Sequence, residues 1–245
     1  MPPCAMREAV VSGFNALGWR CILRGPDHYV PGQREPFDAI AVDGLHGARR
    51  DVIADYTAAG IQALVFDMGF VRRDKYHYVG LGGLNRIPAT ASADRWRALG
   101  VSLARPSKGG DTTVIAGQKI GDAAHPFDSR AEMERWAVET AKQCTGKVVF
   151  RPHPLSPDVA PQGLELDGLP LASSLARASK VIAWTSNIGH DALLAGVEAV
   201  ACGPAAWQGV TLRGRREYFQ RLAYAQWTLP EIASGEAIRF VLDAA

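Results

Sequence analysis

The stretch KVVFRPHPLSP, residues 147–157, joins an apolar run to an arginine, a histidine and three prolines. KVVF has the β-branched and aromatic residues typical of a buried strand. Proline fixes φ and has no N–H to donate to a sheet, so the strand should end at RPHP, with His153 held rigidly between Pro152 and Pro154. The stretch therefore predicts a strand with polar groups at its carboxyl end.

Similar apolar runs occur along the whole chain and alternate with stretches of helical spacing. The predicted strands are WRCIL, FDAIAV and IQALVF within the first 70 residues, then TTVIAG, KVVF, KVIAW and EAVAC; the predicted helices include 129–144, 170–179 and 188–195. Such alternation is typical of parallel sheets covered by helices on both faces. Because the series occurs twice, we expect an α/β fold with two Rossmann-like lobes, each built on a parallel sheet, and a cleft between them.

A connection rich in Pro, Gly, Ser and Lys, LARPSKGGDTT (103–113), separates the two series. It predicts an N-terminal lobe of residues 1–107 and a C-terminal lobe of residues 108–245 that ends in closing helices. In that last part, Thr228 should cap a helix with Pro230 and Glu231 in its first turn, and Trp227 should anchor the packing.

Composition limits the classes of function. The 245 residues are 47% hydrophobic, enough for a sizeable core, and 27 basic against 25 acidic residues give a net charge of only +2. The four cysteines show neither zinc-site spacing nor a disulfide framework. The chain has no apolar run of membrane-spanning length and no signal-peptide pattern at its start, so we expect a soluble cytoplasmic protein; its oligomeric state is not readable.

Polar residues follow several predicted strands, where open parallel sheets bind ligands. They are Asp67, Gln118, Arg151 with His153, and the segment TSNIGHDALLAG that begins at Thr185. A helix starting near Ile188 would offer backbone N–H groups to a phosphate, with Gly189 allowing close approach and Asp191 facing ribose hydroxyls. Ordinary helix capping explains that segment equally well, and Arg151 could assist a ligand or pair with a carboxylate.

Two other segments allow more than one interpretation. YHYVGLGGLNRIP, residues 76–88, is interpreted as a Gly-rich loop, either one that lies over the sugar or the acceptor or a plain surface turn. Its glycines lack the spacing of a nucleotide-binding motif, so no nucleotide role is assigned to it. Asp43 and His46 lie at a strand tip that would face the predicted cleft, but helix capping there is at least as good an explanation.

The motifs together resemble those of the capsule-polysaccharide glycosyltransferases, the Kdo transferases of the bacterial capsule type. The resemblance rests on three segments in the family's order and approximate spacing, which are VIAGQKIGDAAHPFDSRAEM, VVFRPHP and TSNIGHDALLAGVEAVACGPAAW. FDMGFVRR and YAQWTLPEIASGEA resemble two further segments of the family, its acidic-Gly-Phe-x-Arg segment and its closing Gln-Trp-Thr stretch. The resemblance covers about residues 60–240 and implies a GT-B-like, metal-independent transferase that uses a nucleotide sugar as co-substrate and no other cofactor. Asp67 stands where the family more often has Glu, and the chain is short for the class.

The resemblance also implies roles for individual residues. His153 and the turn Thr185, Ser186 and Asn187 would bind the nucleotide phosphate, helped by their neighbours in the motifs, and Asp191 would bind the ribose. The remaining implied donor-site residues are Gln118, Arg151, Pro154 and Gly189. Asp122 matches a carboxylate thought to act as a nucleophile on the sugar, and Asp67 matches the acidic residue that faces the acceptor, as general base or acid.

Three classes of function remain open at this point. The first is a glycosyltransferase with a CMP- or UDP-type donor, whose acceptor is a polysaccharide, a glycolipid or a base in DNA. The others are a sugar-nucleotide epimerase or hydrolase, and a degenerate nucleotide-binding module. For a DNA acceptor, basic residues near the N-terminal cleft would meet the phosphate backbone, although a solvated charged face explains them equally well; they are Arg49, Arg50, Arg72, Arg73 and Lys75.

Overall fold

The computed structural model describes residues 3–25, 28–89, 91–106 and 110–243. Contacts divide these into two compact units, one within 1–99 and 220–245 and the other within 100–219. Residues 220–245, expected in the C-terminal lobe, thus group with the N-terminal residues. The predicted boundary between residues 107 and 108 lies outside the described residues. Among the described helices, none has the length and apolar character needed to cross a membrane.

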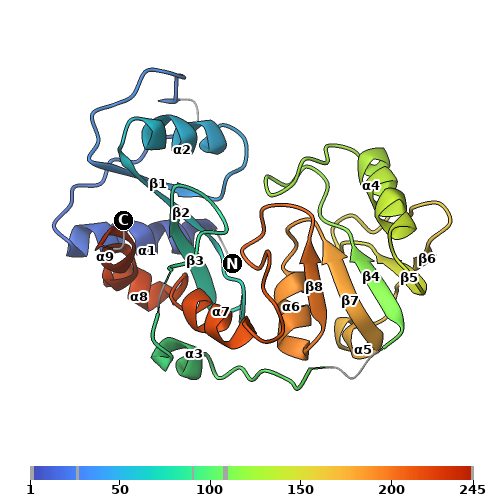
Figure 1. Ribbon diagram of the computed structural model, residues 1–245. Coiled ribbons are helices and arrows are strands. Elements are labelled where there is room, and N and C mark those ends of the chain that lie inside the picture. The colour runs from blue at the N-terminus through green and yellow to red at the C-terminus, as the bar shows by residue number, and fades with distance from the viewer. Residues whose placement is uncertain (1–2, 26–27, 90, 107–109, 244–245) are drawn as a thin grey trace. The chain divides into compact units, whose positions relative to one another are not determined.

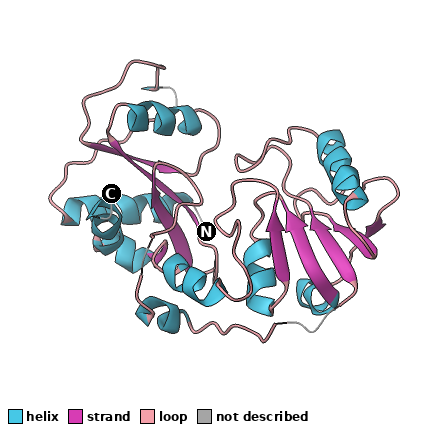
Figure 2. Ribbon diagram, in the orientation of Figure 1, coloured by secondary structure: helices cyan, strands magenta, loops and turns pink. Residues whose placement is uncertain are grey.

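The first unit is built on a four-stranded sheet with the order β1-β2-β3-β9 (Figures 1 and 2). Its strands are β1 (Ala39–Asp43), β2 (Gln62–Met68), β3 (Tyr76–Leu81) and β9 (Gln226–Thr228). Strands β1 and β2 are parallel, whereas β3 is antiparallel to both β2 and β9. The sheet is therefore mixed, and the expectation of a parallel sheet in this part of the chain is wrong.

The correction has a local cause. Only residues 69–75 connect β2 to β3, and so short a connection returns the chain antiparallel, since a parallel crossover needs a dozen residues or more. The first half of the predicted loop 76–88 is thus strand β3, whose residues from Tyr76 to Gly80 are all buried. The expected strand at residues 19–23 is not formed either, because this segment has no ladder partner.

Helices cover both faces of this sheet (Figure 1). They are α1 (Pro3–Ala16), α2 (Arg49–Ala58), α3 (Asp94–Leu99), α8 (Leu229–Ala233) and α9 (Glu236–Asp243). One face presents Leu64, Phe66, Val79 and Trp227 to a core shared with α1, α8 and α9, and α2 packs against β1 and β2.

The turn from strand β9 into helix α8 follows the predicted capping pattern. The Thr228 hydroxyl accepts a hydrogen bond from Glu231 N, and the Glu231 carboxylate accepts one from Thr228 N, which forms the capping box expected at α8. Trp227 is 2% exposed and packs against Phe240, so the prediction that it anchors the packing is confirmed.

The second unit contains a five-stranded, fully parallel sheet with the order β6-β5-β4-β7-β8 (Figure 2). Its strands are β4 (Thr112–Ala116), β5 (Lys147–Arg151), β6 (Glu165–Leu166), β7 (Ala178–Ala183) and β8 (Glu198–Ala201). The predicted parallel sheet is confirmed here. Because the chain proceeds from β4 to β5 and β6 on one side, then returns to β7 on the other, the strand order reverses at β4 and β7.

The helices of the second unit complete its layers. They are α4 (Arg130–Lys142), α5 (Leu171–Arg177), α6 (Ile188–Ala195) and α7 (Arg215–Leu222), the last of which continues into residues grouped with the first unit. A buried cluster of Ile115, Met133, Phe150 and Ile182 joins α4 to the sheet. The helices 129–144, 170–179 and 188–195 expected from the sequence are thus present, with ends shifted by at most two residues.

Candidate functional site

The carboxyl ends of β4 and β7 are joined by the side chain of Gln118. Its Oε1 accepts a hydrogen bond from Thr185 N at 2.7 Å, and its Nε2 donates to Thr185 Oγ1 at 3.0 Å. Both residues are buried. They meet at the reversal of strand order, where doubly wound sheets open a crevice for ligands. Gln118 therefore acts on this edge of the sheet by holding Thr185 in place.

Thr185 also holds the loop that carries Asp122. Its hydroxyl donates to Ala124 O at 2.8 Å, and Ala124 N donates to the Asp122 carboxylate at 3.0 Å. Asp122 is half-buried, with one carboxylate oxygen engaged in this local turn. The predicted carboxylate is thus tied, through one residue, to the end of β7.

The loop after β5 is tied to the same place. Ile120 N donates to Ser156 Oγ at 3.0 Å, and Ser156 N donates to His153 O at 2.8 Å, which closes a turn with Pro154 at its second position. Proline at that position presets φ for the turn. His153 and Thr185, predicted from two strand ends, and Asp122, implied by the family resemblance, are therefore carried by loops that hydrogen bonds join together.

The His153 ring has a defined tautomer. Leu155 N donates to His153 Nδ1 at 3.1 Å, so Nδ1 is an acceptor and the neutral ring carries its proton on Nε2. Nε2–H is a donor of the kind that binds a phosphate oxygen. The ring is half-buried at the edge of the sheet.

Arg151 pairs with a carboxylate, which is one of the two roles that the sequence left open for it. Its guanidinium donates to Asp167 at 3.3 Å and to Leu169 O at 2.6 Å. Asp167 is buried and also pairs with Arg177 and accepts a hydrogen bond from Ser174. Burial by itself raises the pKa of the Asp167 carboxyl, but the hydrogen bonds from Ser174, Leu169 N and Arg151 outweigh it, so the pKa lies below its ordinary value.

Helix α6 begins at Ile188, as the sequence predicts, but the first N–H groups of the helix bond to backbone carbonyls and not to a capping side chain. Asn187 is the N-cap residue and its side chain makes no capping bond. Gly189 N donates to Ser186 O at 3.1 Å, His190 N donates to Asn187 O at 2.9 Å, and Ser186 Oγ lies 3.5 Å from Ile188 N. An anion at this start would therefore meet the side chains of Ser186 and Asn187 together with N–H groups that already make local bonds.

Gly189 is required for packing. A Cβ atom at this position would lie 2.1 Å from Cε2 of Trp207, whose Nε1 donates to Ser186 O at 3.2 Å. Trp207 is fully buried, so the indole covers Gly189 on the side where the sequence suggested that a ligand approaches. Asp191 lies in the first turn of α6 and is half-buried.

The sequence reasoning missed His125. Its Nε2 lies 2.7 Å from Lys119 O and its Nδ1 accepts from Phe127 N at 3.0 Å, so the buried ring spans the loop that contains Asp122. The His-Pro pair at residues 125–126 repeats the pair at 153–154 and was a signal in the sequence. His125 positions the loop rather than facing a ligand.

Asp67 lies in the first unit, near the carboxyl end of β2. It is half-buried, and its Oδ1 accepts from Met68 N at 2.6 Å. The other predicted site residues all belong to the second unit. Within the described ranges, no group of three His, Cys, Asp or Glu side chains is placed to hold a metal ion.

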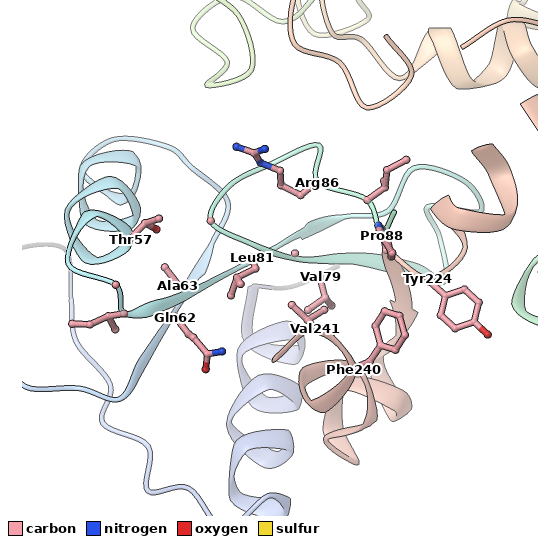
Figure 3. A pocket seen from close by; sticks show the side chains of 16 residues that line it. Thr57, Gln62, Ala63, Val79, Leu81, Arg86, Pro88, Tyr224, Phe240 and Val241 are labelled. Carbon is pink, nitrogen blue, oxygen red and sulfur yellow. The ribbon is translucent and has the colours of Figure 1, made fainter. Parts of the chain in front are cut away.

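A separate cavity of about 570 Å³ occurs in the first unit (Figure 3). Gln62 and Ala63, at the start of β2, line it together with Leu81, Arg86 and Phe240. It is thus at the opposite end of β2 from Asp67, and no predicted site residue contributes to its lining.

Comparisons with known proteins identify a similar fold. No protein-family model matches the chain, and no curated protein matches it at a significant level. Among solved structures, the beta Kdo 2,7 transferase of Thermosulfurimonas dismutans KpsC is similar, with a TM-score of 0.53 and 15% identity over 83% of this chain and 84% of that one. The beta Kdo 2,4 transferase of the same KpsC gives a TM-score of 0.50 and 14% identity over 84% and 81%.

These identities are too low to carry more than the fold. The similarity is nevertheless to the class of protein that the motifs resemble, and it covers most of both chains. The predicted resemblance to the capsule-type Kdo transferases is therefore confirmed at the level of the fold.

Proposed function

We propose that the protein is a glycosyltransferase that transfers a sugar from a CMP- or UDP-type donor to an acceptor hydroxyl. One observation supports this most. Hydrogen bonds join the three loops that carry His153, Asp122 and Thr185, at the point where the strand order of the parallel sheet reverses. The fold shared with the KpsC Kdo transferases supports the same reaction class.

In this proposal the second unit binds the donor. His153 Nε2–H donates to a phosphate oxygen and stabilises the charge of the departing nucleotide. Ser186 and Asn187, at the start of α6, contact the same phosphate, and Asp191 accepts hydrogen bonds from the ribose. Gln118 contributes through Thr185, because its amide is already committed there.

Two carboxylates serve the transfer itself. Asp122 faces the sugar and stabilises positive charge at the anomeric carbon, directly or as a nucleophile, and Asp67 accepts the proton of the acceptor hydroxyl. The bond from the anomeric carbon to the phosphate oxygen breaks with its electron pair on the nucleotide. We propose that these steps need no metal ion.

The acceptor belongs to one of two classes, a glycan or glycolipid hydroxyl or a modified base in DNA. The DNA version rests on the basic residues around Arg49 and Arg72 and predicts binding that weakens steeply with salt. An association with DNA that is absent or insensitive to salt would remove that version and leave the glycan acceptor.

The donor site is tested by thermal shift with CMP, UDP, GDP, dTDP and ADP and their sugar conjugates. A ligand that binds only the folded protein raises its melting temperature. We expect one nucleotide to do so in the wild type and in the control His28→Ala, whose histidine is exposed, and not in His153→Ala. A full shift in a folded His153→Ala variant would contradict the assignment of His153.

Turnover separates the three classes of function. A transferase consumes the donor with formation of a glycosylated acceptor and loses this activity in Asp122→Asn and Asp67→Asn. An epimerase or hydrolase turns over the donor without any acceptor. A degenerate module binds the nucleotide without turnover, and both Asn variants then behave as the wild type.

A further inference from the structure

The cavity of the first unit lies along an open edge of strand β3. Gly82 N donates to Ala63 O at 2.7 Å, which makes these two residues a hydrogen-bonded pair of the antiparallel ladder between β2 and β3. Bonded and non-bonded pairs alternate along such a ladder, so the neighbouring Leu81 turns its N–H and C=O away from β2. Val79 is turned the same way, and its N–H donates to Ala225 O at 3.0 Å.

Strand β9 does not extend as far as Leu81. Its first residue, Gln226, is opposite Tyr78, and the preceding Ala225 uses its N–H for Leu222 O at 2.9 Å, because the chain turns here out of α7. In the parts of the chain that the structure describes, no turn or loop bonds N or O of Leu81 either. Leu81 therefore offers an unpaired donor and an unpaired acceptor at a strand edge, and it lines the cavity.

The cavity has a wall on each side of this edge (Figure 3). Arg86, from the loop after β3, lies on one side, and Phe240 and Val241, from α9, lie on the other. The loop is held in place by the Tyr78 phenol, which donates to Gly83 O at 2.8 Å and accepts from Arg86 N at 3.1 Å. The strand edge and its two walls thus form a groove that exists without a ligand.

The two walls differ in charge. Among the described residues that line the cavity, Arg86 alone is charged; it is exposed, and its guanidinium has no ion-pair partner in the described ranges. The side chain of Leu81 packs on the other side, against the core cluster that contains Val241. In a strand added at this edge, the residue opposite Leu81 would face α9, and its two neighbours would face the loop.

We propose that the groove binds an extended peptide segment of a partner protein, which adds to the edge of β3 as an antiparallel strand. The residue opposite Leu81 exchanges two backbone hydrogen bonds with it. Its apolar side chain packs on Phe240 and Val241, and an acidic neighbour pairs with Arg86. The recognised pattern is therefore an alternation of apolar and acidic residues. Because the groove is at the opposite end of β2 from Asp67, this binding does not depend on the proposed transferase function.

The backbone bonds are tested with the peptide acetyl-Thr-Val-Glu-Val-Thr-amide, titrated into the isotope-labelled full chain. We expect saturable changes in the amide NMR signals, largest at Leu81 and its neighbours, and slower hydrogen exchange of the Leu81 N–H, which gains an acceptor. The same peptide with both valine nitrogens methylated keeps its side chains but cannot donate to Leu81 O. It should leave the Leu81 signal unchanged.

The role of Arg86 is tested by exchanging charges. The wild type should bind the glutamate peptide about two- to fivefold more tightly than the peptide with lysine in place of glutamate, as expected for an exposed ion pair. Arg86→Glu should reverse this order. The control Arg7→Glu, at an exposed position of α1, should keep the wild-type order.

Three results would overturn the inference. They are an unchanged Leu81 signal up to the solubility limit of the glutamate peptide, equal binding of the methylated peptide, and the same order of the two peptides in Arg86→Glu as in the wild type. Equal binding of the methylated peptide would show that apolar contact alone fills the groove. Each of these results leaves the transferase function standing, and a protein that transfers no sugar leaves the peptide groove standing.

Discussion

Gln118 and Thr185 are joined by two hydrogen bonds, 2.7 and 3.0 Å long, between the ends of adjacent parallel strands. The side-chain amide of Gln118 thus bonds both the backbone N–H and the hydroxyl of Thr185. The Thr185 hydroxyl in turn donates a hydrogen bond to Ala124 O. A residue that the sequence places in a ligand pocket shapes this edge of the sheet by binding another residue of the protein.

Replacement of Gln118 by alanine should destabilise the second unit. It leaves the buried Thr185 N–H without its acceptor, which costs roughly 1–3 kcal/mol in the free energy of unfolding. Urea denaturation measures this cost, and Gln143→Ala, at an exposed glutamine, is the control. Equal stability of the two variants would show that the Gln118 amide contributes nothing at this edge.

Replacement of Gly189 by alanine should displace Trp207. The added Cβ overlaps the indole, and overpacking of a buried site typically costs about 1–3 kcal/mol. Because Trp207 Nε1 also bonds Ser186 O, we expect weaker nucleotide binding in the same variant. Gly168→Ala is the control, since nothing lies within 4 Å of a Cβ there. Unchanged stability and unchanged near-ultraviolet circular dichroism in Gly189→Ala would contradict this packing.

The buried Asp167 should make stability depend on acid pH. Its folded pKa lies below the unfolded value of about 3.9, so its contribution is complete above that value and is lost as pH falls through the folded pKa. Asp167→Asn leaves Arg151 and Arg177 without their carboxylate and should cost roughly 3–5 kcal/mol at pH 7, and less in acid.

Unfolding free energies measured between pH 7 and pH 2 test this dependence. The control is Asp158→Asn, which removes an exposed pair with Arg130 and should change stability by less than about 1 kcal/mol. A difference between wild type and Asp167→Asn that stays constant across this pH range would show that the ion pairs do not carry the stability.

Replacement of Arg95 by lysine should destabilise the first unit although it keeps the charge. The guanidinium lies 3.7 Å from the centre of the Trp227 ring and bonds Glu231 at 2.7 Å and Ala223 O at 3.0 Å. A lysine cannot stack and donate in these directions together, so we expect a loss of about 1–2 kcal/mol. In thermal unfolding, Arg95→Lys should melt at a lower temperature than the control Arg97→Lys, which changes an exposed position on the same helix. Equal melting temperatures of the two variants would contradict the role of the planar guanidinium.

The candidate site shows where prediction from sequence succeeds and where it stops. The residues after β4, β5 and β7 could be identified because apolar runs mark buried strands, and polar residues at their ends stand out against them. The partners of those residues could not be identified. Gln118 bonds a residue 67 positions away and Arg151 pairs with Asp167 across a loop, and no local pattern encodes such pairs.

For this chain, the sequence by itself determined the α/β class, the parallel sheet of the second unit and the helix starts at Ser129, Ile188 and Thr228, because strand and helix periodicity and capping are local. Tertiary structure alone decided the antiparallel direction of β3, the grouping of residues 220–245 with the first unit and the bonding of Gln118 to Thr185. These depend on which distant segments bury their apolar faces together, a choice made by the free energy of the whole core and not by any short stretch of it.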